Sequence, residues 1–202
     1  MSLDWSGCPG YRDLGGLPAT DGRSIRDGAL ARSGSQHALS PATVDAIRAS
    51  AVARIVDLRW AWECAQTPSP FLGHAVHRHV PMLNDVLGYE PPPETYAPML
   101  DHNGPRIAQA FRAVADAPPG PVVVHCTAGR DRTGVLTALL LQVAGVGADA
   151  IAADYAISGG SPAPMINTLN HLYDRYGDAP SYLRACGVEQ DRLTAVRDRL
   201  LG

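Results

Sequence analysis

The chain has 202 residues, a formal net charge of −3 and 46% hydrophobic residues, so it can bury a sizeable core in one domain or in two small ones. Its basic residues are all arginine, and the slight excess of acidic groups argues against a nucleic-acid-binding protein and against electrostatic binding to anionic membranes. No segment approaches the roughly 18 consecutive apolar residues of a membrane-spanning helix, which argues against an integral membrane protein.

The cysteines lie far apart and form no Cys-x-x-Cys pair, a pattern unlike a zinc ribbon or a dense disulfide framework. They are Cys8, Cys64, Cys126 and Cys186. The first ten residues contain neither a basic segment nor an apolar segment of the kind found in signal peptides. We therefore expect a reduced, cytoplasmic protein, with export by a route without a recognisable signal as the alternative.

The first third of the chain predicts short strands separated by turns. Residues 10–35 are rich in Gly, Asp and Arg, and short strands are expected around Ile25 and over residues 29–32. Ser40 is a good N-cap and Pro41 suits the first position of a helix, so a helix begins there. Two further segments, ARIVDLR (53–59) and AVHRHVPM (75–82), are typical of strands.

The rest of the chain is mainly helical. A Pro-rich loop over 91–101 becomes helical near Tyr96, and residues 106–117 have helical spacing of apolar positions up to the PPGP break. Strand 122–125 follows, and the next helix, over 133–145, is apolar nearly all round and is therefore expected to be buried. Further helices are predicted over 148–158, 165–177 and 182–201, the last segment containing a short helix and an amphipathic one.

This alternation predicts an α/β domain over residues 1–202, with a central, mainly parallel β-sheet flanked by helices on both faces. Residues 148–185 form either a helical lid or an ordinary packed helical layer. Ligands of such sheets bind beyond the carboxyl ends of the strands. Cys126 follows strand 122–125 at such an end, which makes it a candidate functional residue.

The segment that follows the strand, which we call the Cys126 loop (residues 126–132), has the composition of an anion site. It is short, has Gly129 in its middle for unusual backbone angles, and opens onto the start of a helix, where backbone N–H groups and the helix dipole favour a tetrahedral oxyanion. Arg132 can add a bidentate guanidinium contact. The expected anion-binding residues are Thr127, Ala128, Gly129, Arg130, Asp131 and Arg132.

The same surroundings favour covalent chemistry at Cys126. Helix N-termini and neighbouring cations stabilise thiolates, so we expect Cys126 to be largely ionised and to attack the bound phosphorus. Thr133 could donate a hydrogen bond to the sulfur, and His125 is expected to be a neutral residue that orients the loop. The leaving group needs a proton, for which Asp131 is the candidate general acid. Asp101 and Asp85, on upstream loops, are the competing candidates.

The string His125-Cys126-x5-Arg132-Thr133-Gly134 resembles the signature of cysteine-dependent phosphatases, which comprise protein tyrosine phosphatases and their dual-specificity and phosphoinositide relatives. The fuller HCTAGRDRTG resembles the bacterial branch of the mycobacterial tyrosine phosphatase B type. The likeness extends to YRDLGG, DGRSIRDGALARSG, IVDLR and DYAIS, and to the C-terminal YLRACGV, and is loosest over residues 60–105.

The resemblance implies a dual-specificity-like phosphatase fold, a phosphocysteine intermediate, no cofactor, and Asp131 as the general acid. It also implies activity on phosphotyrosine, sometimes on phosphoserine or phosphothreonine, and on phosphoinositides. Arg130 stands where the branch usually has a lysine that is linked to additional substrate phosphates. Either Arg130 takes over that contact, or it is a solvated charge in a chain without lysine.

Some neighbouring residues have two readings. Asp57 could brace Arg130 or the Cys126 loop, or it could belong with Arg59 to a simple turn at the end of a strand. Arg12 and Asp13 could support the loop from below or likewise form a turn.

Three other groups of residues are expected to have structural roles. His77 and His79 fall on one face of a strand, but His74 is out of step and no carboxylate or thiol is interleaved, so we predict no metal site. His79 could line the rim of the pocket. Trp60 and Trp62 are expected to pack or to form a pocket wall. Under oxidation, Cys64 or Cys186 could form a disulfide with Cys126, although disulfide geometry is strict.

We therefore predict a protein-tyrosine phosphatase that acts on a phosphorylated protein or peptide. The alternatives are a phosphoinositide or small-metabolite phosphatase and, less favoured, a catalytically dead phospho-binding module. The last of these usually lacks the cysteine, the arginine or the acid, all of which are present here. Sulfur transfer and arsenate reduction fit the sequence less well. The oligomeric state is not predicted.

Overall fold

The computed structural model describes residues 5, 7–85 and 91–202. The prediction about an export signal in the first ten residues therefore falls in part outside the described residues. Within the described ranges, five strands form one sheet in the order β1-β2-β5-β3-β4, in which β1 is antiparallel to β2 and all other pairs are parallel. The strands are β1 (Arg12–Asp13), β2 (Leu30–Ser33), β3 (Arg54–Asp57), β4 (His77–His79) and β5 (Val122–His125).

The register of the parallel strands brings their carboxyl ends to one edge. Ser33 and Asp57 both pair with His125, and His79 pairs with Asp57. The segments that leave β2, β3, β4 and β5 therefore start side by side. This is the edge at which a parallel sheet binds its ligands.

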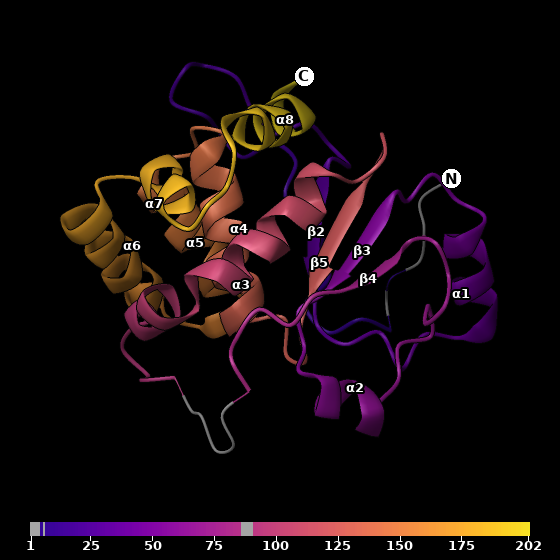
Figure 1. Ribbon diagram of the computed structural model, residues 1–202. Coiled ribbons are helices and arrows are strands. Elements are labelled where there is room, and N and C mark those ends of the chain that lie inside the picture. The colour runs from indigo at the N-terminus through magenta and orange to yellow at the C-terminus, as the bar shows by residue number, and fades with distance from the viewer. Residues whose placement is uncertain (1–4, 6, 86–90) are drawn as a thin grey trace.

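Helices cover both faces of the sheet, as predicted (Figure 1). α1 lies on one face, α3, α4 and α8 pack on the other, and the short α2 lies at one edge of the molecule. The helices are α1 (Pro41–Arg48), α2 (Ala61–Gln66), α3 (Ala97–Ala115), α4 (Asp131–Val143), α5 (Ala148–Gly159), α6 (Ala163–Tyr176), α7 (Ala179–Ala185) and α8 (Gln190–Leu201).

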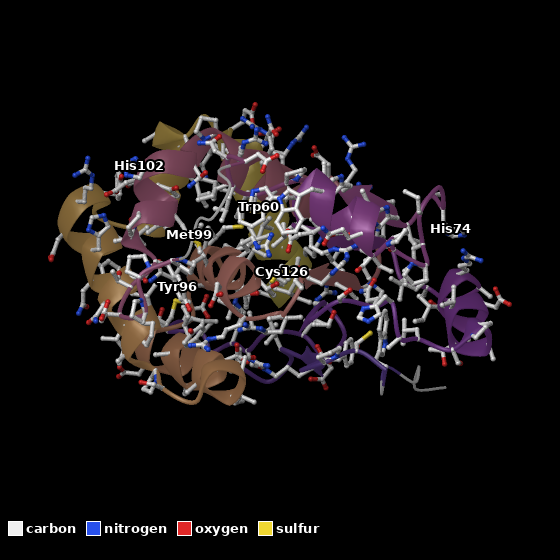
Figure 2. All side chains as sticks on the ribbon, turned by 90° about the horizontal axis from the view of Figure 1, so that it is seen from below. Trp60, His74, Tyr96, Met99, His102 and Cys126 are labelled. Atoms are coloured by element: carbon white, nitrogen blue, oxygen red, sulfur yellow. The ribbon has the colours of Figure 1, made fainter. Side chains whose placement is uncertain are left out.

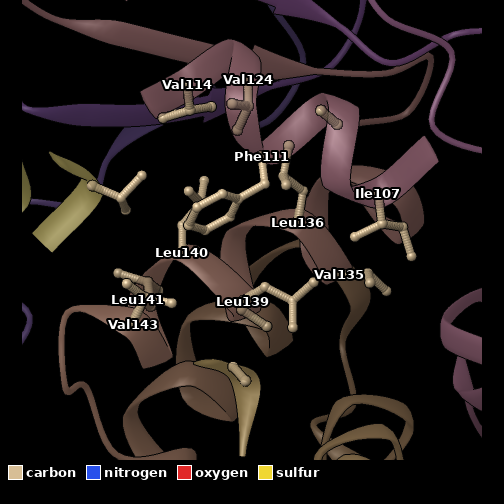
Figure 3. Close-up of a cluster of buried hydrophobic side chains, with 14 of the residues drawn as sticks. Ile107, Phe111, Val114, Val124, Val135, Leu136, Leu139, Leu140, Leu141 and Val143 are labelled. Carbon is tan, nitrogen blue, oxygen red and sulfur yellow. The ribbon is translucent and has the colours of Figure 1, made fainter. Parts of the chain in front are cut away.

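Alternation of side chains along the strands divides the core. On one face, Ile55 and Val123 pack with Ile47 of α1. On the other, Val124 packs with Phe111 of α3 and with α4 (Figure 3). The buried residues of α4 point in almost every direction, as the sequence predicted, because α4 packs against the sheet as well as α3, α5, α7 and α8. Its N-terminus, and with it the Cys126 loop, is thereby held rigidly against the sheet.

The structure corrects three predicted elements. Ile25 is buried but lies outside any strand, and only the bridge between Pro18 and Ser24 forms there. The Ile25 N–H donates to the Leu17 oxygen, but the Ile25 oxygen accepts from the Gly16 N–H, which shifts the register and ends the pairing. The two helical segments predicted near Tyr96 and over 106–117 form one helix, α3, which is kinked at Asn103. Two short elements, β1 and α2, were not predicted.

Residues 148–185 form α5, α6 and α7, which pack on α3, α4 and one another. α6 buries Met165, Leu169 and Leu172 in the core. That this segment acts as a lid remains a prediction. No helix in the described ranges is both long and apolar enough to cross a bilayer.

Candidate active site

Cys126 lies at the carboxyl edge of the sheet, directly between β5 and the loop that enters α4. Its side chain is buried, with 2% of its surface exposed. Figure 2, seen from below, shows Cys126 near the centre of the molecule, with Trp60 and Tyr96 on two sides of it. Because α4 begins at Asp131, the positive end of its dipole is directed at the loop that contains the thiol.

The carbonyl groups of the Cys126 loop are bound from outside. His125 Nδ1 lies 3.2 Å from the Cys126 oxygen, and the Ser35 N–H donates to the Thr127 oxygen over 2.9 Å. Arg32 Nη2 donates to the Gly129 oxygen over 3.0 Å. Each peptide is planar and trans, so its N–H points away from its carbonyl. The N–H groups that follow are thus turned inward, and those of residues 127–130 find no acceptor among the described residues.

Two glycines permit this close packing. Gly129 has φ +72°, and a Cβ there would lie 2.5 Å from the backbone of Ser33 and Gly34. A Cβ on Gly34 would in turn lie 3.1 Å from the Thr127 oxygen. Gly129 is therefore required both for its backbone angle and for its contact with the end of β2.

Arg132 is held by a carboxylate that the sequence analysis did not single out. Its Nη1 and Nη2 lie 2.5 and 2.9 Å from the two carboxylate oxygens of Glu63 on α2. The Thr127 hydroxyl also donates to Glu63, and the guanidinium stacks 4.6 Å from the centre of the Trp60 ring. Burial alone would raise the pKa of Glu63, but the hydrogen bonds from Arg132 and Thr127 outweigh it and lower the pKa. Since Glu63 uses the outer end of the guanidinium, the edge that carries Nε remains available for an anion.

Asp131 is fixed by a chain of hydroxyl groups. The Tyr96 hydroxyl donates to Asp131 Oδ1 over 2.5 Å and lies 2.6 Å from the Tyr155 hydroxyl. Arg130 Nε donates to the same Tyr155 oxygen over 3.2 Å, and it lies 3.5 Å from Asp131. Asp131 Oδ2 has no protein hydrogen-bond partner among the described residues.

Asp57 is completely buried and lies beneath the strand that leads to Cys126. It accepts from Arg59 over 2.9 and 2.6 Å, and lies 3.5 Å from His77 and 3.7 Å from His125. Arg130 is not among its contacts, and bracing of the loop through His125 remains a prediction. The Arg59 N–H donates to Asp57 Oδ1 over 3.1 Å, as in the strand-end turn that was the alternative. Burial would raise the pKa of Asp57, but His77, the hydrogen bonds from Arg59 and the nearby His125 hold it well below its usual range.

His125 is buried, and burial lowers its pKa, an effect opposed by the Asp57 carboxylate. A neutral imidazole that orients the Cys126 carbonyl agrees with this environment. Thr133 is also buried, and its hydroxyl has no protein partner in the part of the chain that the structure describes. Its expected hydrogen bond to the sulfur remains a prediction.

The competing acids differ in their surroundings. Asp101 accepts from His171 and Tyr176 over 2.9 and 2.7 Å, in a contact between α3 and α6. Asp85 is exposed and follows Asn84, whose oxygen accepts from Trp60 Nε1 over 3.1 Å. Asp13 accepts from the backbone of Gly15 and Gly28, as in the turn that was the alternative reading.

The three histidines are engaged separately. The His77 ring faces Asp57, His79 Nε2 lies 2.8 Å from the Arg59 oxygen, and His74 Nδ1 accepts from Val76 N. The described residues contain no group of three or more His, Cys, Asp or Glu that could hold a metal ion.

The four cysteines are free. Cys64 Sγ lies 3.6 Å from Asp57 Oδ2 and 3.4 Å from His79 Nε2, and burial followed by the Asp57 charge raises its pKa to about 11. Trp60 and Trp62 stack on each other. A disulfide with Cys126 under oxidation remains a prediction.

The comparison with known proteins agrees with this geometry. A model described as "Tyrosine phosphatase family" matches residues 3–161. A tyrosine-protein phosphatase of Nostoc commune is 28% identical to this chain over 91% of the chain and 78% of the relative. A Cupriavidus necator protein whose name assigns it to the tyrosine-protein phosphatases is 31% identical, over 85% and 68%. The triple specificity protein phosphatase PtpB of Mycobacterium tuberculosis is 51% identical, over 41% and 44%.

Replacement of Asp57 by Asn should leave the Arg59 charge buried without a counterion and lower the free energy of unfolding at pH 7 by about 3–5 kcal/mol. The folded-state pKa of Asp57 lies below its unfolded-state value near 4, so its stabilisation is complete above about pH 4 and declines as the pH falls below it. The difference in free energy of unfolding between wild type and variant, measured by denaturant unfolding, should therefore narrow in acid. Asp21→Asn, which removes an exposed ion pair, is the control. A difference in free energy of unfolding that stays constant from pH 7 to pH 3 would contradict this role of the Asp57 carboxylate.

Replacement of Glu63 by Gln should free Arg132 from its fixed orientation while keeping the size of the side chain. We expect KM for a phosphomonoester to rise and kcat/KM to fall about 10-fold, the loss of roughly 1.4 kcal/mol expected for one charge-assisted contact. Steady-state kinetics would measure this, with Glu189→Gln, in an exposed ion pair with Arg112, as the matched control. A lower KM in the Glu63 variant would instead mean that this carboxylate competes with substrate.

Proposed function

The chain belongs to the tyrosine phosphatase family, and on that premise we propose that it hydrolyses phosphotyrosine in a protein or peptide through a phosphocysteine intermediate on Cys126. The observation that carries the proposal is the convergence, in one seven-residue loop, of a buried cysteine, inward-turned N–H groups and Arg132. This arrangement matches the charge and shape of a phosphoryl group in transfer.

In the first step, the Cys126 thiolate attacks phosphorus as the bond from phosphorus to the ester oxygen breaks. Asp131 donates its proton to that oxygen, and the alcohol or phenol leaves. The backbone N–H groups and the Nε edge of Arg132 stabilise the three equatorial oxygens. In the second step, water attacks the phosphocysteine and Asp131 takes its proton. The sulfur–phosphorus bond then breaks, which releases phosphate and restores the thiolate, with Thr133 as the proposed donor to the departing sulfur.

A second candidate substrate class is supported by Arg130. Its side chain is 43% exposed and lies beside the anion site, where it could contact a further phosphate group of a phosphoinositide or of a small metabolite. We rank phosphotyrosine first, since all three named relatives are protein phosphatases by name. We also propose that the enzyme works in the cytoplasm, where a catalytic thiol stays reduced.

Hydrolysis of a phosphotyrosine peptide and of a soluble phosphoinositide, measured side by side, tests the assignment. We expect turnover of the peptide, no detectable turnover by Cys126→Ser, and a kcat about 10²–10⁴-fold lower for Asp131→Asn, the usual contribution of a general acid. The loss of kcat in Asp131→Asn should be smaller for an aryl phosphate with a good leaving group, because such a leaving group needs no proton. Faster turnover of the phosphoinositide would move the assignment to that class. Activity that survives in Cys126→Ser would reject the covalent mechanism.

Replacement of Tyr96 by Phe removes the hydroxyl that holds Asp131. We expect kcat for phosphotyrosine to fall about tenfold, as for one hydrogen bond to a charged group, and kcat for a nitrophenyl phosphate to change little. Tyr182→Phe, which deletes a buried hydroxyl bonded to the Leu100 oxygen, is the matched control. Equal losses on both substrates would show that Tyr96 does not act through the acid.

A further inference from the structure

A buried ion triad joins three distant segments directly behind the Cys126 loop. Arg32 of β2 is 1% exposed, and its Nη1 lies 2.7 Å from Asp154 Oδ2 on α5. Arg12 of β1 approaches the same carboxylate, with its Nε 2.7 Å from Oδ1. Arg12 also donates to the Asp154 oxygen and to the Ser158 hydroxyl, so Asp154 is held on both sides.

The other end of Arg32 reaches the loop itself. Its Nη2 donates to the Gly129 oxygen over 3.0 Å and lies 3.4 Å from the Arg130 oxygen. These two carbonyls belong to the peptides whose N–H groups are those of Arg130 and Asp131. The Gly129 oxygen has no other donor among the described residues, whereas the Arg130 oxygen also accepts the Gly134 N–H over 2.7 Å. Arg32 therefore turns the Arg130 N–H toward the anion site and supports the helical orientation of the next peptide.

We propose that Arg32, anchored by Asp154 and Arg12, is a positioning residue that holds the Cys126 loop in its anion-binding conformation. The inference rests on the proposed function only in that the anion is taken to be the phosphoryl group of a substrate. Arg32 does not contact the substrate in this account. It fixes the backbone that does.

The cost of burial supports a specific role for this arginine. A buried guanidinium needs a counterion and partners for its N–H groups, and one carboxylate shared by two guanidiniums leaves a net charge of about +1 under the loop. The planar fork of arginine spans the carboxylate and the carbonyls at once, which an ammonium group cannot do. Gly134 lies against the same group: a Cβ there would be in ordinary contact with Arg32 Nη2 at 3.5 Å, but would crowd the Tyr155 ring at 3.1 Å.

The test measures binding of inorganic phosphate by titration calorimetry, without turnover, for wild type, Arg32→Lys and Asp154→Asn. In an acyl-transfer enzyme, loss of one oxyanion-hole donor lowers kcat by about 10²–10³-fold, and here the Arg130 N–H is misdirected rather than removed. We expect phosphate to bind at least about tenfold more weakly to both variants, and kcat for an aryl phosphate to fall with it. Arg32→Lys keeps the charge, so a loss in that variant identifies the geometry of the fork as the cause.

Two further variants keep the test decisive. Val196→Ala removes buried volume from α8, away from the loop, and should lower thermal stability with no change in phosphate affinity. Arg12 is more exposed, at 17% of its side chain, so Arg12→Gln should fold and weaken phosphate binding by a smaller factor even if Arg32→Lys does not fold.

The outcomes separate this inference from the proposed function. A wild-type protein that binds no phosphate would reject the phosphoryl site itself. A wild type that binds phosphate, with folded Arg32→Lys, Asp154→Asn and Arg12→Gln variants within twofold of it, would overturn the positioning role. If Arg32→Lys bound phosphate as tightly as wild type while Asp154→Asn did not, the charge of Arg32 and not the geometry of its guanidinium would account for binding. That result would also overturn the positioning role.

Discussion

A peptide unit can turn only one of its two polar groups toward a bound anion, and the site around Cys126 depends on this constraint. For the loop to present N–H groups to an anion, its carbonyls must face the protein, and buried carbonyls need donors there. The structure supplies a separate donor for most of them: the His125 ring, the Ser35 N–H and Arg32. The carboxyl edge of β2 provides two of these three, so the strand next to β5 is as much a part of the site as β5 itself.

The charges around the site are arranged on the same principle. Two arginines of the site each have an acidic partner: Glu63 for Arg132, which is part of the loop, and Asp154 for Arg32, which lies behind it. The carboxylates hold the guanidiniums in place and leave some N–H groups directed inward. The Tyr96 hydroxyl likewise holds Asp131, the proposed general acid, and is itself hydrogen-bonded to the Tyr155 hydroxyl. Most of the polar groups near Cys126 thus have fixed positions before any ligand binds, which is the condition for strong stabilisation of developing charge.

The parts of the site that could be predicted from the sequence are those encoded in one contiguous stretch. Three valines, His125, Cys126 and the Gly129 turn followed by Arg132 specify a strand, a loop and a helix, and local rules suffice to interpret them. Mainly parallel topology followed from the alternation of strands and helices. Ile25 was misassigned because a buried apolar residue beside a single bridge has the same local pattern as a residue within a strand.

What sequence reasoning missed depends on contacts between distant segments. Glu63 lies in an unpredicted six-residue helix, and nothing in WAWECA shows that its carboxylate meets Arg132. Tyr96, Tyr155 and Arg32 look like ordinary core or strand residues until the fold places them beside residues 129–131. Arg12 and Asp154 stood in segments that resembled the family, but their pairing across 142 positions carried no local signal.

Cys126 is proposed to carry the phosphoryl group during turnover. Rapid-quench mixing of wild type with a radiolabelled phosphotyrosine peptide, followed by mass spectrometry, tests it directly. The account predicts phosphate covalently bound to Cys126 within the first turnover; label on another residue, or turnover with no protein-bound phosphate, would contradict it.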